Sequence, residues 1–500
     1  MTVIREDDLR QSIADALQFI SHYHPPDFIR HLATAYAREE SPAAKAAMAQ
    51  ILRNSRMAAL GRRPICQDTG VANVFLKVGM RVRIDSPRGL QEIVDDAVRD
   101  AYLRDDNPLR ASMVHDPVFD SRNTGDNAPG ILNVRLVPGN RIEADVSAKG
   151  GGSENKAKFA VLDPGESIAD WVAQTVETLG AGWCPPGILG IGAGGGAETA
   201  MLLAKESLNE PLDMADLLAR GPATKAEAMR IDIYERVNAL GIGAQGLGGL
   251  QSVLDVKLRT FPAHAASLPV ALIPNCAATR HVHFALDGSG PARFSPPDLS
   301  AWPDIPDDPA AMLRVIDLDS LSAESVRDWK VGETLLLSGK LYTGRDAAHR
   351  RMAELIEKGE PLPVDLRDKA IYYVGPVDAV RDEVIGPAGP TTSTRMDRYL
   401  STVLPATGLR VMIGKAERGP AATETIRAAG AVYLIAVGGA AYLVAQSIRA
   451  ARIAAWPDLG MEAIHELEVK DMPVMVALDS TGASVHASGP AFWRGQFRLL

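Results

Sequence analysis

Apolar residues recur every three or four positions over residues 9–60, which predicts helices rather than strands. The apolar row that begins at Leu9 is interrupted at Pro25-Pro26. Ser41-Pro42 is typical of a helix start, because serine caps free backbone N–H groups and proline fits the first turn. The pattern therefore predicts three successive helices.

From Val71 onward apolar and polar residues alternate over residues 72–84 and 130–146, which predicts strands joined by glycine-containing turns. Later in the chain, short apolar runs alternate with helical stretches and predict a second α/β unit. These runs read TLLLSG, AIYYVGP, AVYLIAV and VMVALD. The uncharged stretch 428–445 is barely long enough for a membrane helix, and Gly438-Gly439 breaks it. We expect a buried strand, a turn and a helix there.

Six prolines fall within residues 291–310, which predicts an extended linker without a packed element of its own. The pattern thus predicts an α/β protein of two domains. The larger N-terminal domain covers residues 1–286, the proline-rich linker residues 287–311, and the smaller C-terminal domain residues 312–500.

The composition is that of an ordinary globular protein, with 46% hydrophobic and 23% charged residues among 500. A net charge of −9 and the lack of a basic run argue against nucleic-acid binding. The N-terminus is charged and carries no apolar signal-like segment, so we expect a cytoplasmic protein without a membrane partner. An anionic ligand would need local Arg and Lys residues.

The chain contains only 3 cysteines and no CxxC pair, which excludes a disulfide framework and zinc-ribbon spacing. Isolated cysteines are usually buried thiols in the core. Cys66, Cys184 and Cys276, however, each lie where an apolar or aromatic approach gives way to a turn or to polar residues. Three loop thiolates can hold a cubane iron–sulfur cluster and leave one iron open, as a Lewis acid, to bind an oxygen atom of a substrate. Zinc held by three cysteines and a water is the alternative, and spacing does not separate the two.

Three glycine-rich segments are candidates for contact with a ligand. GIGAGGG at 190–196 and GIGAQGLGG at 241–249 both contain G-x-G-x-x-G. Pro185-Pro186 leaves little strand before the first match and a helical stretch precedes the second, so we expect neither to lie in a dinucleotide-binding βαβ unit. We expect their backbone amides to line a site for an anion or for cluster sulfides, with a purely structural turn as the alternative. KGGGSENK at 149–156 predicts backbone that approaches a ligand closely, or else a flexible hairpin tip.

Cationic side chains recur in loops of the second half. Arg345, Arg395 and Lys415 lie in or beside glycine-rich or proline-rich loops, and Arg110 is a fourth candidate from the first half. Such cations in an acidic protein predict recognition of carboxylates through forked hydrogen bonds.

Together these segments resemble the class I fumarate hydratases, the oxygen-sensitive iron–sulfur family. The match covers nearly the whole chain in order, and the family also includes two-subunit L-tartrate dehydratases and enzymes acting on mesaconate. Fusion of both parts in one chain favours the fumarase form. The matching strings are ICQDTG, NTGDN, KGGGSENK, GIGAQGLGG, TGRDAAH, GPTTSTRMD and DLGMEAIHELEV.

The resemblance implies reversible hydration of fumarate to (S)-malate, a step of the tricarboxylic acid cycle, by a homodimer. It implies a [4Fe–4S] cluster held by Cys66, Cys184 and Cys276 in the first domain, and a swivelling-type second domain. The implied site residues are catalytic Thr391, Asp68 and His264, and substrate-binding Gln67, Arg110, Gly151, Arg345, Arg395 and Lys415.

Alternatives remain at this point. The family also fits L-tartrate or mesaconate as substrate. A zinc-dependent lyase is a different enzyme, and an iron–sulfur sensor is the non-enzymatic reading. The net charge of −9 argues against a sensor that contacts nucleic acid.

Overall fold

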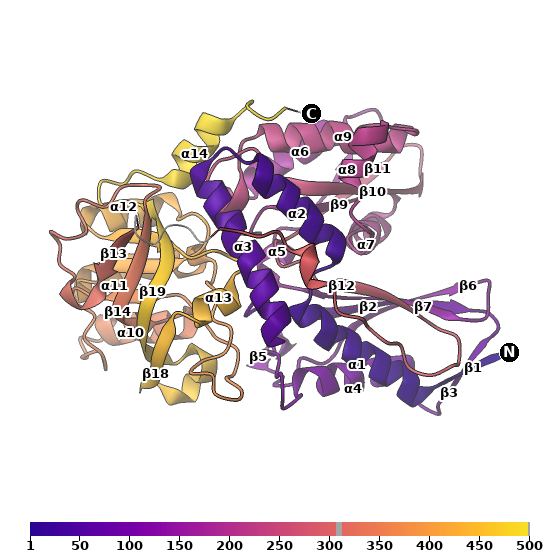
Figure 1. Cartoon of the computed structure of the whole chain (residues 1–500), viewed down its shortest axis with the longest axis horizontal. Helices are drawn as coiled ribbons and strands as arrows, with labels where there is room; N and C mark the ends of the chain where they lie inside the picture. Colours follow the sequence, from indigo (N-terminus) through magenta and orange to yellow (C-terminus); the bar gives the residue numbers. More distant parts are fainter. Residues whose placement is uncertain (307–312, 499–500) are drawn as a thin grey trace.

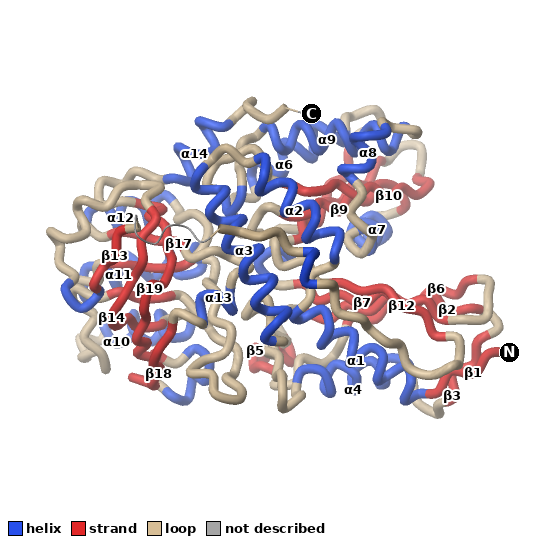
Figure 2. Tube along the Cα trace, viewed as in Figure 1, coloured by secondary structure: helices blue, strands red, loops and turns tan. Residues whose placement is uncertain are grey.

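The computed structural model describes residues 1–306 and 313–498 as helices packed on several β-sheets (Figures 1 and 2). The helices are α1 Glu6–His22, α2 Pro26–Arg38, α3 Pro42–Gly61, α4 Leu90–Tyr102, α5 Gly151–Glu154, α6 Ile168–Thr178, α7 Ala197–Ser207, α8 Met214–Arg220, α9 Lys225–Ala239, α10 Asp346–Glu357, α11 Asp397–Thr407, α12 Pro420–Ala428, α13 Ala441–Ala445 and α14 Val485–Trp493. The strands are β1 Thr2–Arg5, β2 Val71–Gly79, β3 Val82–Asp85, β4 Val114–Asp116, β5 Asp120–Asn123, β6 Ile131–Val137, β7 Ile142–Lys149, β8 Lys158–Leu162, β9 Gly187–Gly195, β10 Val253–Ala263, β11 Leu268–Asn275, β12 His281–Leu286, β13 Arg314–Asp317, β14 Thr334–Thr343, β15 Ala370–Tyr372, β16 Val411–Gly414, β17 Val432–Ile435, β18 Ile448–Ala455 and β19 Ile464–Leu478.

The three predicted N-terminal helices are confirmed as α1, α2 and α3. The Ser41 hydroxyl accepts a hydrogen bond from the backbone N–H of Ala44 at 3.4 Å, with proline in the first turn of α3. The apolar row from Leu9 faces a sheet of order β12-β7-β2-β6, and α4 packs beside α1 in the same core. Helix α3 instead runs between the N-terminal sheets and the second half of the chain (Figure 1).

A second N-terminal sheet has the order β10-β9-β11-β8, and the first G-x-G-x-x-G lies inside its strand β9. The expectation of little strand at this match is wrong, because β9 begins directly after Pro185-Pro186, is followed by α7 and pairs in parallel with β10. A Cβ at Gly192 would lie 2.0 Å from the Ala200 carbonyl oxygen, and one at Gly190 would lie 2.3 Å from that of Ala204. These glycines therefore let helix α7 approach the sheet. A close helix–strand contact thus explains why Gly190 and Gly192 carry no side chain, and an anion or cluster site at GIGAGGG stays a prediction.

The second half contains a seven-stranded sheet of order β13-β14-β15-β16-β17-β19-β18. Strand β19 pairs with β17 through its last residues and also pairs with β14. Because β14, β15, β16 and β17 are joined in turn, these strands and β19 close into a ring around an apolar core. The four predicted apolar runs are confirmed as β14, β15, β17 and β19.

The uncharged stretch 428–445 folds as predicted, with strand β17, a turn and helix α13. Over residues 1–306 and 313–498, no helix is both long enough and apolar enough to cross a membrane.

The described part of the predicted linker is not free of packed structure, and this prediction is wrong. Leu299–Ala301 forms a 3-10 turn, and the Trp302 side chain is buried in a core with residues from both halves. The indole donates to the Ser55 hydroxyl of α3 at 2.8 Å. Prolines limit regular structure but do not prevent an intervening aromatic side chain from packing. Residues 307–311 of the predicted linker lie outside the described residues.

The two halves share packing in two places. One apolar core combines Ile51 of α3 with Ile371 and Tyr433 from the second half. At the C-terminus, the chain returns to the first half, where the Gly495 N–H donates to the Ala239 carbonyl at 2.7 Å and Phe497 is buried. The α/β class is confirmed, whereas the two-domain division and its boundaries stay a prediction.

The close contact between α7 and β9 can be tested by Gly192→Ala. We expect this substitution to lower the free energy of unfolding by about 1–3 kcal/mol, because the new methyl group overlaps backbone that cannot move independently. Urea unfolding measures the change. Gly89→Ala is the control, since its Cβ would meet no atom closer than 3.6 Å. Equal effects of the two substitutions would contradict this account.

Candidate active site

The cysteines lie in three loops at the ends of regular elements, as their sequence contexts predict. Cys66 lies between α3 and β2, Cys184 between α6 and β9, and Cys276 directly after β11. Cys184 has a φ of 58°, a value that is uncommon for a residue with a Cβ and indicates a tight turn. Each loop therefore presents its thiol from a different part of the first half.

The thiols come together around the ammonium group of Lys415 from the second half. Lys415 Nζ lies 2.9 Å from Cys184 Sγ, and the Ala277 N–H donates to the Cys184 carbonyl at 3.0 Å. Burial opposes the charge on Lys415, but the charges of Cys184, Cys66 and Cys276 raise its pKa. Burial raises the pKa of the Cys66 thiol, and that of Cys184 to about 11. Cys66 and Cys184 are thus buried thiols, and the three cysteines lie close enough for their charges to interact with one another.

The zinc and cluster alternatives differ in how far apart their ligands stand. Zinc needs its protein ligands at about 2.0–2.3 Å from one point. Within residues 1–306 and 313–498, no three His, Cys, Asp or Glu side chains are grouped so as to hold a single metal ion. A cubane cluster instead takes one thiolate at each of three separate corners, so its ligands stand farther apart. Three thiols from three loops fit that donor set.

Two residues of glycine-rich loops support the Cys184 turn. A Cβ at Gly438 would lie 2.6 Å from Cys184 Sγ, so only glycine fits there. Gln245 donates to the Pro185 carbonyl through its backbone N–H at 2.8 Å and accepts from the Gly438 N–H, also at 2.8 Å. GIGAQGLGG thus supports the Cys184 turn through the backbone N–H and the side chain of Gln245.

A cavity of about 340 Å³ lies beside Lys415, between the two halves. It brings together all the predicted substrate-binding residues and two of the predicted catalytic ones. Its lining includes Gln67, Asp68, Arg110, Gly151, Arg345, Thr391, Arg395 and Lys415.

Asp68 is held in place on one wall of this cavity. The Gly151 N–H donates to its carboxylate at 2.9 Å, and Arg280 donates to its backbone carbonyl at 2.8 Å. Burial opposes ionisation, but the charges of Arg110, Arg280 and Lys415 lower the pKa of Asp68. The prediction that KGGGSENK brings backbone to a site is consistent with this contact. Arg280 was missed, although it lies only four residues after Cys276.

Two arginines line this cavity, and Arg110 lies 3.7 Å from the Asp68 carboxylate. Arg110 donates to the Gly375 carbonyl at 2.8 Å, and Arg345 lies 3.4 Å from Glu462, but the buried Nε of each has no partner among the described residues. Burial, together with the charge of Arg110, lowers the pKa of Arg345 to about 10. Two buried cations that repel each other form a preorganised anion site.

Arg395 occupies a different position at the mouth. Its side chain is half-exposed and is paired with Asp346 at 2.7 Å. A second cavity of about 720 Å³ shares Asp68, Arg110, Arg345 and Arg395 and extends toward the β4–β5 hairpin and the turn Pro457–Glu462. The inner cavity therefore continues into a wider outer one.

His264 is not brought to this cavity. It lies in the exposed turn between β10 and β11, where its Nδ1 accepts from the Ala266 N–H at 3.1 Å. Nothing in the geometry of the described chain supports a catalytic role for it, and that role stays a prediction.

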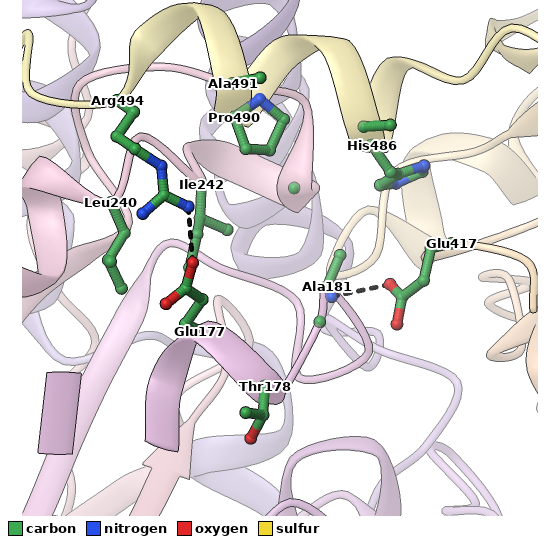
Figure 3. Close-up of a pocket in the computed structure, with 13 residues that line it drawn as sticks. Glu177, Thr178, Ala181, Leu240, Ile242, Glu417, His486, Pro490, Ala491 and Arg494 are labelled. Atoms are coloured by element: carbon green, nitrogen blue, oxygen red, sulfur yellow. Dashed lines mark hydrogen bonds and ion pairs between the residues drawn. The ribbon is translucent and has the colours of Figure 1, made fainter. Parts of the chain in front are cut away.

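A separate cavity of about 410 Å³ lies behind the Cys184 turn and contains none of the predicted site residues (Figure 3). Glu417, two residues after Lys415, accepts a hydrogen bond there from the Ala181 N–H at 2.8 Å. The same loop of the second half thus holds the Cys184 turn at two points. Arg494 and Glu177 close the far end with an ion pair of 2.6 Å.

Comparison with known proteins identifies the family. A family model described as "Fumarate hydratase (Fumerase)" matches residues 10–285, and one described as "Fumarase C-terminus" matches residues 288–489. The chain belongs to the fumarate hydratase family. It is therefore a hydro-lyase enzyme, and the reading as a non-enzymatic sensor is not supported.

Several curated relatives match over most of the chain. The anaerobic class I fumarate hydratase of Escherichia coli is 32% identical over 454 residues, which is 87% of this chain and 81% of that protein. Fumarate hydratase 2 of Leishmania major is 31% identical over 466 residues, 87% of this chain and 79% of that protein. A putative L(+)-tartrate dehydratase subunit alpha of Methanocaldococcus jannaschii is 34% identical over 265 residues, 52% of this chain and 90% of that subunit.

Because Arg345 is buried with few partners, we expect its removal to weaken anion binding without destabilising the protein. Arg345→Met should weaken binding of a small dicarboxylate at least tenfold, because a charge-assisted hydrogen bond contributes about 1.5–3 kcal/mol. The free energy of unfolding should stay unchanged or rise, since a buried, under-partnered cation is removed. Titration calorimetry with malonate and urea unfolding measure the two effects.

Arg350→Met is the matched control for this prediction. Arg350 lies on the solvent side of α10, the helix that begins directly after Arg345, with a side chain 63% exposed and 3.9 Å from Glu354. Its loss should change neither quantity by more than about 0.5 kcal/mol. Malonate binding by Arg345→Met at the strength of the unsubstituted protein would rule out the anion site.

Proposed function

We propose that this enzyme catalyses the reversible hydration of fumarate to (S)-malate, with a [4Fe–4S] cluster held by Cys66, Cys184 and Cys276. One observation carries the proposal. Lys415 contacts the thiol of Cys184 and also lines the cavity that contains the other cations, so the cysteines and the cavity lie side by side. The names of the relatives at 31–32% identity supply the substrate and the class.

The thiols suit such a cluster because they are three and come from separate loops, with Cys66 and Cys184 buried and Cys276 partly exposed. When bound, a cluster with three protein ligands supplies an open iron that acts as a Lewis acid toward a substrate oxygen. The protein supplies the space through Gly438 and the nearby positive charge through Lys415.

The cavity suits a small dicarboxylate. Arg110 and Arg345 offer unsatisfied N–H groups to one carboxylate, and Lys415 offers an ammonium at the thiol side. Gln67 is fixed by donation to the Pro390 carbonyl at 3.1 Å, and its side-chain oxygen lies 3.3 Å from Cys66 Sγ. Arg395 attracts the anion at the mouth.

The same cations serve the difficult step of the reverse reaction, which is removal of a weakly acidic C–H proton from malate. Negative charge moves onto the neighbouring carboxylate as the proton leaves, and a buried guanidinium stabilises that charge more strongly than water does. Arg110 and Arg345 are therefore assigned to transition-state stabilisation as well as to binding.

Thr391 is the proposed base, although a free hydroxyl is a weak one. Its backbone is fixed by donation to the Tyr373 carbonyl at 2.7 Å, and its carbonyl accepts from the Lys415 N–H at 3.2 Å. Thr391 and Lys415 also line the same cavity, and a cation there favours a partly negative hydroxyl oxygen. Asp68, held as a carboxylate, accepts a hydrogen bond from a water or hydroxyl in the same cavity.

L-Tartrate is the second candidate substrate, because the M. jannaschii relative matches the first half of the chain. Tartrate carries one hydroxyl more than malate. A pocket that leaves that hydroxyl without a partner discriminates against it.

Anaerobic turnover tests the proposal. Protein reconstituted with iron and sulfide should show a broad visible absorption band and hydrate fumarate, and both should fall in air. The kcat/KM for fumarate should exceed that for L-tartrate or mesaconate at least tenfold. A colourless, air-stable and active protein would exclude the cluster, and preference for tartrate would reassign the substrate.

The role of Thr391 is tested separately. Thr391→Ala should lower kcat about 100-fold or more with little change in KM, because positioned acid–base groups contribute about 10²–10⁴-fold. Thr391→Ser keeps the hydroxyl and should retain most of the activity. Turnover of Thr391→Ala at the normal rate, measured at full cluster content, would remove the assignment.

A further inference from the structure

Helix α3 buries two consecutive polar side chains, Asn54 and Ser55, which are 0% and 1% exposed. Neither side chain bonds to the preceding turn of its own helix, which is the usual option for serine in a helix. Their hydrogen bonds instead leave the helix and reach other segments. Buried polar groups are costly unless they are satisfied, so the partners they find specify how these segments pack.

Asn54 joins the Cys66 loop to the second half of the chain. Its side-chain NH₂ donates to the Ile65 carbonyl at 3.0 Å and to the Gly439 carbonyl at 2.9 Å. Its side-chain oxygen accepts from the Leu443 N–H at 2.9 Å. Ile65 directly precedes Cys66, and Gly439 directly follows the glycine that makes room for Cys184 Sγ. One amide thus fixes the approach to two thiols.

Ser55 reaches the Cys276 loop through a directional relay. The Trp302 indole can only donate, and it does so to the Ser55 hydroxyl at 2.8 Å. Ser55 therefore directs its own proton to His24 Nδ1 at 2.7 Å. His24 Nε2 is left as the donor to the Ala277 carbonyl at 3.0 Å, next to Cys276.

The surroundings of His24 maintain this direction. The ring is 1% exposed, and burial lowers the pKa of His24 to about 3. It is therefore neutral at ordinary pH, with one donor and one acceptor nitrogen. A neutral ring between a hydroxyl donor and a carbonyl acceptor satisfies every group in the relay.

We propose that Asn54 and Ser55 are positioning residues that hold the Cys66 and Cys276 loops at the spacing that the cluster needs before it binds. The inference rests on the proposed function, because it takes these cysteines as the cluster ligands. A rigid helix supplies the reference frame, so less loop ordering remains to be done when the cluster binds.

The competing explanation is that both residues only stabilise the fold. The chain offers matched controls for this. Asn238 is likewise 0% exposed and makes three hydrogen bonds to backbone, to Val253 twice and to Ser252 once. Ser207 is buried and donates only to the Ala204 carbonyl. Neither control bonds to a cysteine or to a neighbour of one.

The test compares Asn54→Ala and Ser55→Ala with Asn238→Ala and Ser207→Ala in the full chain. Iron and sulfide bound per chain after anaerobic reconstitution, the rate at which the visible band bleaches in air, and the thermal midpoint of the cluster-free protein are measured. We expect the α3 variants to bind at most half the iron or to bleach at least threefold faster than controls of similar midpoint. Ser55→Thr, which keeps the hydroxyl, should restore cluster content.

The outcomes distinguish the positioning role of Asn54 and Ser55 from the proposed function of the enzyme. Equal cluster content and bleaching rates in α3 variants and controls would overturn the positioning role, while the proposed function would stand. If Asn54→Ala does not fold, the difference between Ser55→Ala and Ser55→Thr decides, because Thr supplies the same relay proton. An unsubstituted chain that binds no iron or sulfide would overturn the proposed function itself.

Discussion

Burial of the Lys415 ammonium against Cys184 is the interaction on which the rest of the site depends. An ammonium removed from water must find negative charge or hydrogen bonds, and here it finds thiols that belong to the other half of the chain. The Cys184 thiol loses water in the same place. Each group makes the burial of the other tolerable, so the two halves are held together at the point where chemistry is proposed.

The other polar contacts across this boundary follow the same logic. Glu417 and Lys415 lie on one loop and hold the Cys184 turn from two sides, through a backbone N–H and through the thiol. Asn54 reaches both the Cys66 approach and the Gly439 carbonyl. The boundary is therefore crossed by specific hydrogen bonds as well as by a shared apolar core.

Two arginines of the cavity, unlike Lys415, are buried without enough partners for their polar groups. Arg110 and Arg345 are buried close together with an unpartnered Nε on each, an arrangement that favours an anion and not the protein's own stability. Arg395, at the mouth, is already paired with Asp346. Stability is thus lowered where substrate is proposed to bind and restored around it, as expected for a preorganised site.

The sequence by itself determined the local elements, the family and the identity of most cavity residues. Helices from residue 9 to 60, the strands around β2 and β7, and the strand–turn–helix at 428–445 follow from periodicity and caps, which act over a few residues. Motifs such as ICQDTG are long and specific, so Gln67 and Asp68 could be assigned to the site from the sequence. Tertiary structure decided what depends on contacts between distant segments. Most of GIGAGGG lies in strand β9 with α7 packed closely on it, Trp302 is buried and anchors a proline-rich segment, and His264 lies in an exposed turn. The roles of Arg280, Gly438 and Asn54 come from neighbours up to 389 positions away, and no local pattern of side chains encodes such a distance.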